Sequence, residues 1–187
     1  MKSAGLILAA GESRRMGAPK ALLTFQGETF LDRLVRLFAE RCSPVIVVLG
    51  AFPTLPVPAP ARTVLNGAWQ SGQTSSMQRG LREVPADADG VLFTLVDHPA
   101  VAPSTLDALL AATGQLRIPR FAGQRGHPVW FSRELIGELL AVPSGGAARD
   151  VLRARYSEAA FLDVDDPGIV ADIDDRSAYE ALLEAHS

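Results

Sequence analysis

This chain of 187 residues has a single cysteine, no excess of basic over acidic residues and no long apolar run. The single cysteine, Cys42, cannot form a disulfide within the chain, and its apolar, helical surroundings indicate packing rather than a reactive or metal-binding thiol. A formal charge of −3 argues against a general nucleic-acid surface, which usually shows a basic excess. The longest apolar runs, such as residues 45–52, are far shorter than the roughly 18 residues of a membrane helix. We therefore expect neither a membrane nor a nucleic acid as partner.

The N-terminal segment also lacks the features of a signal peptide. Its apolar stretch is brief, and Glu12, Arg14 and Arg15 follow where a longer hydrophobic region and a small-residue cleavage site would be required. We expect a cytoplasmic protein. The chain is 48% hydrophobic, which is enough for an ordinary core at this length, and it contains no repeat or linker composition. Residues 1–187 are therefore predicted to form one domain.

Apolar runs of strand length alternate with segments of helical periodicity along the whole chain. Several of the runs are apolar at every position, as in strands that helices cover on both faces. The pattern predicts an α/β protein, a three-layer sandwich with a mainly parallel, doubly wound sheet. The predicted strands are 5–10, 44–50, 90–99, 127–131, 159–164 and 168–174, and the predicted helices are 30–38 (capped by Thr29), 75–84, 103–112 (capped by Ser104), 132–141, 148–156 and 176–185.

The loop from Gly11 to Lys20 follows the first predicted strand, where open α/β sheets bind their ligands. Its glycines allow backbone N–H groups to approach an anion, and its arginines and lysine can supply charge-assisted hydrogen bonds. A plain glycine turn with solvated arginines is the alternative. Two common phosphate motifs do not fit: five residues separate Gly11 from Gly17, where a P-loop has four, and a dinucleotide fingerprint would require a glycine between them.

The same stretch, LAAGESRRMGAPK, resembles the signature L-A-A-G-x-S-x-R-M-G-x-x-K of the molybdenum cofactor nucleotidyltransferase-like family. This family belongs to the NTP transferases with a modified Rossmann-like fold of the nucleotide-diphospho-sugar transferase type. The resemblance implies that Arg15 and Lys20 are catalytic and that the rest of the loop binds nucleotide. The matching residues are Leu8, Ala9, Ala10, Gly11, Ser13, Arg15, Met16, Gly17 and Lys20.

Three downstream segments extend the resemblance to nearly the whole chain. The segment NGAWQSGQTSS resembles the family's Asn, Trp and Gly-x-Ser-Ser turn, which implies nucleotide contacts from Asn66, Gly72, Ser75 and Ser76. The segment LVDHP resembles Leu-x-Asp-x-Pro, which implies that Asp97 binds metal and is catalytic. The segment DIDDRSAY resembles the closing family element, which implies a second metal ligand at Asp174 or Asp172. A strand-end aspartate that merely caps a turn is the alternative reading of Asp97.

Two further segments resemble elements near the acceptor site. These are RGHPVWF, with His127, and GGAARDVL, with Arg149. The chain departs from the family pattern at Val96, where glycine is common, and at Ser144 and Gly145, where an acidic residue is common. We assign no chemistry to His98, because relatives more often have other residues there.

The resemblance implies Mg²⁺-dependent nucleotidyl transfer with release of pyrophosphate. Ala9-Ala10-Gly11 favours CTP over GTP, since the guanylyl branch more often has Ala-Gly-Gly. The implied acceptor is the phosphate of molybdopterin or the molybdenum cofactor, with transient docking to a molybdoenzyme. A transferase for another phosphorylated acceptor, such as a sugar phosphate, and a non-catalytic cofactor carrier or chaperone remain alternatives.

Overall fold

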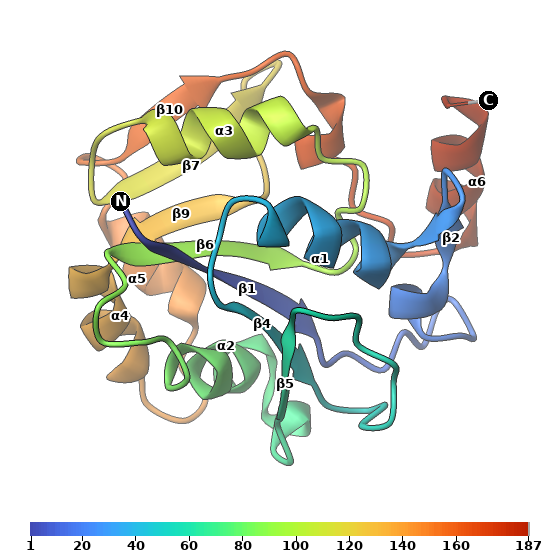
Figure 1. Ribbon diagram of the computed structural model, residues 1–187, viewed down its shortest axis with the longest axis horizontal. Helices are drawn as coiled ribbons and strands as arrows, with labels where there is room; N and C mark the ends of the chain where they lie inside the picture. The colour runs from blue at the N-terminus through green and yellow to red at the C-terminus, as the bar shows by residue number, and fades with distance from the viewer. Residues whose placement is uncertain (187) are drawn as a thin grey trace.

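A mixed sheet of eight strands lies between two layers of helices in the computed structural model, which describes residues 1–186 (Figure 1). The strands are β1 (Ser3–Ala9), β2 (Thr24–Phe25), β3 (Glu28–Thr29), β4 (Val45–Leu49), β5 (Arg62–Leu65), β6 (Gly90–Leu95), β7 (Leu116–Phe121), β8 (Gln124–Arg125), β9 (Val129–Ser132) and β10 (Ala160–Asp163). The α-helices are α1 (Phe30–Ala39), α2 (Gln73–Leu81), α3 (Pro103–Ala111), α4 (Arg133–Leu140), α5 (Ala148–Ala154) and α6 (Arg176–Glu184), with short 3-10 helices η1 (Lys20–Leu22), η2 (Trp69–Ser71) and η3 (Pro167–Ile169). Within the described residues, no helix has the length and apolar character needed to cross a bilayer.

The sheet order is β10-β7-β9-β6-β1-β4-β5, with β8 paired to β7 and a separate two-stranded sheet formed by β2 and β3. The β1 strand is parallel to both β4 and β6, whereas β9 is antiparallel to β6 and β7. Leu8 lies opposite Val48 of β4 and Leu95 of β6, so three central strands end at the same edge. The predicted α/β sandwich with a mainly parallel, doubly wound sheet is confirmed.

Alternate residues of β1 supply the two halves of the core. Leu6 and Leu8 pack on the face covered by α2, α4 and α5, and Ile7 and Ala9 pack on the face covered by α1 and α3. All seven residues of β1 are buried, which explains why its sequence is apolar without a break. Cys42 is buried in the α1 side of this core, as its surroundings predicted.

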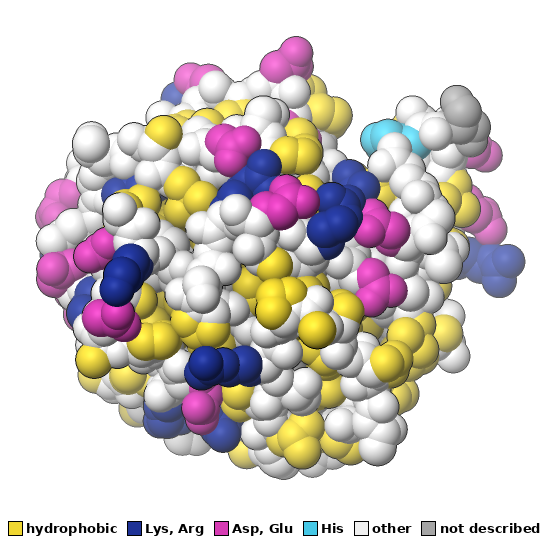
Figure 2. All heavy atoms as spheres, in the orientation of Figure 1, with side chains coloured by type: hydrophobic (Ala, Val, Ile, Leu, Met, Phe, Trp, Pro, Cys, Tyr) yellow, Lys and Arg dark blue, Asp and Glu magenta, His cyan; other side chains and the backbone are white. Residues whose placement is uncertain are grey.

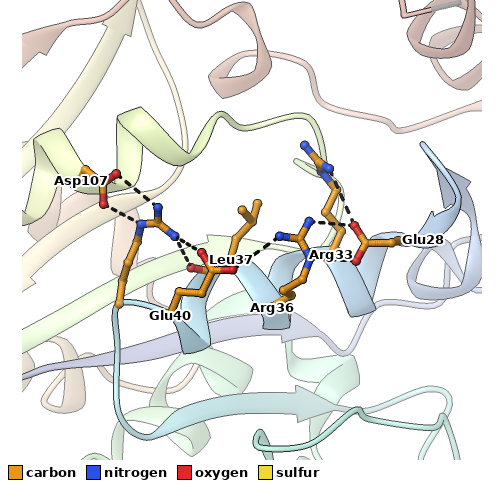
Figure 3. A network of polar contacts seen from close by, with 7 residues as sticks. Glu28, Arg33, Arg36, Leu37, Glu40 and Asp107 are labelled. Carbon is orange, nitrogen blue, oxygen red and sulfur yellow. Dashed lines mark hydrogen bonds and ion pairs between the residues drawn. The ribbon is translucent and has the colours of Figure 1, made fainter.

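Helix α1 is anchored at both ends by side-chain contacts. Thr29 caps its first turn, accepting a hydrogen bond from the Asp32 N–H at 3.0 Å, as predicted. Arg36 pairs with Glu28 at 2.8 Å, and Arg41 pairs with Asp107 of α3 at 2.6 Å (Figure 3). On the face of the molecule that Figure 2 shows, basic and acidic side chains lie next to one another and are not separated into patches of one sign.

Two predictions about local structure are wrong, and one strand was missed for a clear reason. Ser104 does not cap α3: the helix begins at Pro103, whose fixed φ suits the first turn, and Asp166 accepts from the Ala102 N–H at 2.8 Å. Residues 168–174 do not form a strand, because they begin in η3 and continue as irregular chain. Strand β7 was not predicted, since Pro119 interrupts its pattern.

Candidate active site

The candidate site lies at the carboxyl edge of β1, β4 and β6. Two backbone hydrogen bonds hold the segments that leave these strands beside β1, from Val96 N to Leu8 O at 3.0 Å and from Ala51 N to Ala10 O at 3.1 Å. A cavity of about 560 Å³ opens beyond this edge. It is lined by Leu8, Ala9, Ala10, Gly11, Glu12, Ser13, Arg14, Arg15, Pro19, Lys20, Ala21, Phe52, Leu55, Trp69, Gln70, Gly72, Gln73, Ser76, Leu95, Val96, Asp97 and Asp174.

The loop after β1 keeps most of its backbone N–H groups available for a ligand. From Gly11 to Ala18, only the Met16 N–H donates to another backbone group, the Ser13 carbonyl at 3.0 Å. Ser13 has a φ of 52°, a conformation uncommon outside glycine, and its hydroxyl accepts the Lys20 N–H at 3.1 Å. Gly17 has a φ of 69°. The loop therefore closes on itself through Ser13 and presents Lys20 at the start of η1.

Lys20 connects two acidic residues that are distant in sequence. Its Nζ lies 3.0 Å from Asp97 Oδ2 and 2.6 Å from Asp174 Oδ1, while Arg15 Nη2 lies 2.7 Å from Asp174 Oδ2. Lys20 is buried, whereas the Arg15 side chain is mostly exposed. Burial lowers the pKa of Lys20, but hydrogen bonds and charge from Asp174 and Asp97 outweigh it, so the net pKa is raised and the ammonium keeps its proton.

The segment 172–174 is attached to the site through its middle residue. The Ile173 N–H donates to the Asp97 carbonyl at 3.0 Å, and the Ile173 side chain is buried in the core. Asp172 and Asp174 therefore flank Ile173, whose position is fixed by this hydrogen bond and by its burial. The Lys20 hydrogen bond is the largest cause of the lowered Asp174 pKa, whereas burial, followed by the charges of Asp97 and Asp174, raises the pKa of Asp172.

Asp97, His98 and Asp172 form a group with metal-ligating chemistry. One ligand atom from each residue lies within 4.8 Å of the others. Asp97 Oδ1 is buried and has no hydrogen-bond partner among the described residues, although Lys20 engages Oδ2. An unsatisfied buried carboxylate oxygen beside a second carboxylate fits a divalent cation. Asp174, in contrast, is engaged by two cationic side chains.

Asn66 and Ser75 hold the loop between β5 and α2. The buried Asn66 amide donates to the hydroxyls of Ser75 and Ser76, each at 2.9 Å, and its Oδ1 accepts the Ala68 N–H at 3.0 Å. These bonds shape the turn that brings Gly72 and Ser76 to the cavity.

A second cavity of about 490 Å³ adjoins the first, since Gln73 and Leu95 line both. It contains His127 and Arg149, together with Arg125, whose guanidinium lies 4.6 Å from the centre of the Tyr156 ring. Burial, with a smaller contribution from His98, lowers the pKa of His127 to about 3, so this imidazole is neutral.

The predicted site residues fall into three groups: those that line the first cavity, those that line the second, and those that line neither. Eleven of them line the first cavity, namely Leu8, Ala9, Ala10, Gly11, Ser13, Arg15, Lys20, Gly72, Ser76, Asp97 and Asp174. His127 and Arg149 line the second cavity. Gly17, Asn66, Ser75 and Asp172 line neither, although Asp172 joins the metal-ligating group.

His98 is a residue of the metal-ligating group that the sequence analysis missed. Its side chain is only 7% exposed, and Nε2 lies 3.9 Å from Asp97 Oδ1. Burial is the main reason that its pKa is lowered. The only signal in the sequence was its position next to Asp97, which does not reveal that both side chains turn the same way.

Comparisons with known proteins agree with this geometry. The model of the MobA-like NTP transferase domain family matches residues 5–160. The purine catabolism protein PucB of Bacillus subtilis is 30% identical, with 98% of this chain and 97% of that protein covered. A probable molybdenum cofactor guanylyltransferase of Mycobacterium avium is 28% identical, with 100% and 98% covered. The crystal structure of Rv0371c from Mycobacterium tuberculosis has a TM-score of 0.85 at 28% identity, with 98% of each chain covered, and Rv0371c has also been solved in complex with manganese.

Proposed function

We propose that this chain, which belongs to the family of MobA-like NTP transferase domains, transfers a nucleoside monophosphate to the phosphate of molybdopterin or the molybdenum cofactor. The chain is a nucleotidyltransferase by family, and the acceptor is the proposed part. The proposal depends chiefly on Lys20, which lies between Asp97 and Asp174 in the wall of a cavity of about 560 Å³. The name of the Mycobacterium avium relative supports the acceptor.

The residues around the first cavity suit a triphosphate. Lys20 and Arg15 form ion pairs with carboxylates and can exchange these partners for phosphate oxygens. The free N–H groups after Gly11 add uncharged donors that are already oriented. Together these groups stabilise the negative charge that grows on the departing pyrophosphate.

The acceptor phosphate attacks the α-phosphorus of the triphosphate, and pyrophosphate leaves. A phosphate is already ionised near neutral pH, so the reaction needs in-line positioning more than a protein base. A divalent cation held by Asp97 and Asp172, proposed as Mg²⁺, would neutralise charge on the phosphate oxygens. Asp174 orients Lys20 and Arg15 rather than the cation.

The second cavity is the proposed acceptor site. It adjoins the first at Gln73 and Leu95, so an acceptor bound there can reach the α-phosphorus. Arg125 and Arg149 supply positive charge for the acceptor phosphate, and Tyr156 and the neutral His127 supply aromatic faces for a flat ring system.

Two nucleotides remain as candidates for the donor. Ala9-Ala10-Gly11 favours CTP by resemblance, whereas the Mycobacterium avium relative is named a guanylyltransferase, which favours GTP. We keep CTP as the prediction that this resemblance implies and GTP as the alternative that the name of the relative supports.

A nucleotidyltransferase for another phosphorylated acceptor is the second candidate function. PucB, which is 30% identical, is named for purine catabolism and not for molybdenum cofactor synthesis. The departures from the family pattern at Val96, Ser144 and Gly145 also weaken the resemblance on which a molybdopterin acceptor depends.

Pyrophosphate release tests the proposal. Purified protein would be assayed with a divalent cation and each nucleoside triphosphate in turn, with and without molybdopterin, alongside Asp97→Ala. We expect release that requires molybdopterin, is fastest with CTP and is lost in the variant. If release were fastest with GTP, the proposed donor would change from CTP to GTP and the rest of the proposal would stand. If only other acceptors supported release, molybdopterin would be the wrong acceptor. Nucleotide binding without release would indicate a carrier.

A further inference from the structure

His98 has a nitrogen that no protein group uses. Its side chain is only 7% exposed, and Nδ1 is buried without a hydrogen-bond partner among the described residues. The other ring nitrogen, Nε2, lies 3.9 Å from Asp97 Oδ1, which is also buried and unpartnered. Buried polar atoms of native proteins are almost always satisfied, so the unpartnered Oδ1 with an imidazole nitrogen beside it points to a missing ligand. The His98 ring also lies beside the tilted ring of His127, with 4.9 Å between ring centres, and His127 Nδ1 is likewise unpartnered among the described residues.

The position of His98 suits a ligand held jointly with the two carboxylates. A nitrogen of His98 and carboxylate oxygens of Asp97 and Asp172 lie within 4.8 Å of one another. Lys20 contacts Asp97 Oδ2, whereas His98 Nε2 lies 3.9 Å from the unpartnered Oδ1. The ion pair with Lys20 and a cation can therefore use different oxygens of the same carboxylate.

We propose that His98 is a third protein ligand of the divalent cation and that its imidazole makes the site prefer Mn²⁺ to Mg²⁺. Mg²⁺ binds almost entirely through carboxylates, phosphates and water, and it gains little from an imidazole nitrogen. Imidazole is an ordinary ligand of transition metals, which bind nitrogen sites more strongly. The inference rests on the metal site of the proposed function, where Mg²⁺ would still bind but more weakly than Mn²⁺, and it does not depend on the identity of the nucleotide or the acceptor.

The test uses Mn²⁺ alone, without nucleotide or acceptor, on the full-length protein. Electron spin echo measurements of bound Mn²⁺ detect a directly bonded nitrogen, and a protein labelled with ¹⁵N at histidine alone identifies its origin. We expect the nitrogen modulation of the unlabelled protein to change to the ¹⁵N pattern after labelling. A wild-type protein that binds Mn²⁺ without this histidine signal, or that binds no Mn²⁺, overturns the proposal without any variant.

Variants then assign the signal among the three histidines of the chain. His98→Ala should lose the signal and weaken Mn²⁺ binding by at least about tenfold, while His186→Ala, changed outside the site, and His127→Ala should keep the signal. His98→Gln, which offers an amide oxygen instead, should lower the ratio of Mn²⁺ to Mg²⁺ affinity by at least about threefold. Loss of the signal in His127→Ala with retention in His98→Ala would contradict the assignment.

Circular dichroism melting of each variant separates loss of a ligand from loss of the fold. Because metal binding is measured without transfer, a failed transfer assay would leave this result intact. Conversely, transfer activity in a protein without the histidine signal would keep the proposed function and remove His98 from it.

Discussion

Lys20 is the residue through which separate parts of the chain meet at the candidate site. It binds Asp97, which follows β6, and Asp174, which precedes α6, and it is buried while doing so. A neutral replacement would leave two carboxylates facing the triphosphate without their cation.

We predict that Lys20→Ala lowers kcat by about 10²- to 10³-fold, as expected for the loss of one oriented charge at the transition state. Lys20→Arg should recover little of this loss, because a guanidinium is larger and its donors are arranged in a fixed fork. Steady-state kinetics of pyrophosphate release would measure the effect. The other lysine, Lys2, is exposed and pairs with Asp87, so Lys2→Ala is the matched control and should retain full activity.

Cys42 provides a prediction about pH. Burial raises the pKa of its thiol to about 12 in the folded protein. Since the ordinary value is about 8.5, the stabilising contribution of the neutral thiol is complete below that pH and is lost as the pH rises toward 12. We expect the free energy of unfolding of the wild type to fall by about 2 kcal/mol more than that of Cys42→Ala between about pH 8 and pH 10, as measured by urea denaturation. Parallel decreases in the two proteins would contradict the prediction.

The sequence could predict the charged residues of the site but not their division of roles. The resemblance selected Lys20, Asp97, Asp172 and Asp174 because their types and spacing match a family pattern. It left open which aspartate binds metal, since that depends on where Ile173 is buried and on which carboxylate Lys20 reaches. His98 was missed because side-chain direction after a strand is decided by tertiary packing.

At the scale of elements, Asp166 joins two segments that lie apart in sequence, the start of α3 and the 3-10 helix η3. Its Oδ2 accepts from the Ala102 N–H at 2.8 Å and from the Thr105 hydroxyl at 2.6 Å, and its Oδ1 accepts from the Gly168 N–H at 2.9 Å. It therefore satisfies donors at the start of α3, which has no side-chain cap of its own, and also supports η3.

We predict that Asp166→Ala destabilises the fold by about 2–4 kcal/mol, because it leaves several buried donors unsatisfied. The adjacent Asp165 is exposed, so Asp165→Ala should change stability by less than about 0.5 kcal/mol. Denaturant unfolding of both variants would measure the difference. A similar small effect from both changes would mean that water can replace the carboxylate of Asp166.

Elements with strong local signals were predictable, and those that depend on distant partners were not. Helix α1 has a cap at Thr29 and a clear apolar stripe, so its start was predicted from the sequence. Strand β7 contains Pro119 and is recognisable only through its pairing with β9 and β10. Residues 168–174 contain strand-forming residues, but Pro167 and the Asp166 contact with Gly168 turn the chain into η3 instead.

At the scale of the whole molecule, the prediction of a single domain can be tested with the two tryptophans. Trp130 lies in β9 and donates to Ser3 Oγ at 3.0 Å, whereas Trp69 lies in η2 beside the first cavity. Each of the variants Trp69→Phe and Trp130→Phe keeps one tryptophan as its fluorescence probe. Because one sheet connects the two regions, we expect that within each variant the denaturation midpoint measured by fluorescence equals the midpoint measured by circular dichroism. Different midpoints would indicate two separately unfolding units.

The central position of β1 also has a consequence for synthesis. Both neighbours of β1 come later in the chain, β4 from Val45 and β6 from Gly90, and all seven residues of β1 are buried in the finished sheet. At a translation rate of about 5–20 residues per second, this apolar strand is synthesised several seconds before β6, the second strand with which it pairs. An unpaired apolar strand invites association with other chains. The strand that supports the phosphate loop in the finished protein is therefore a segment that chaperones would shield in the nascent chain.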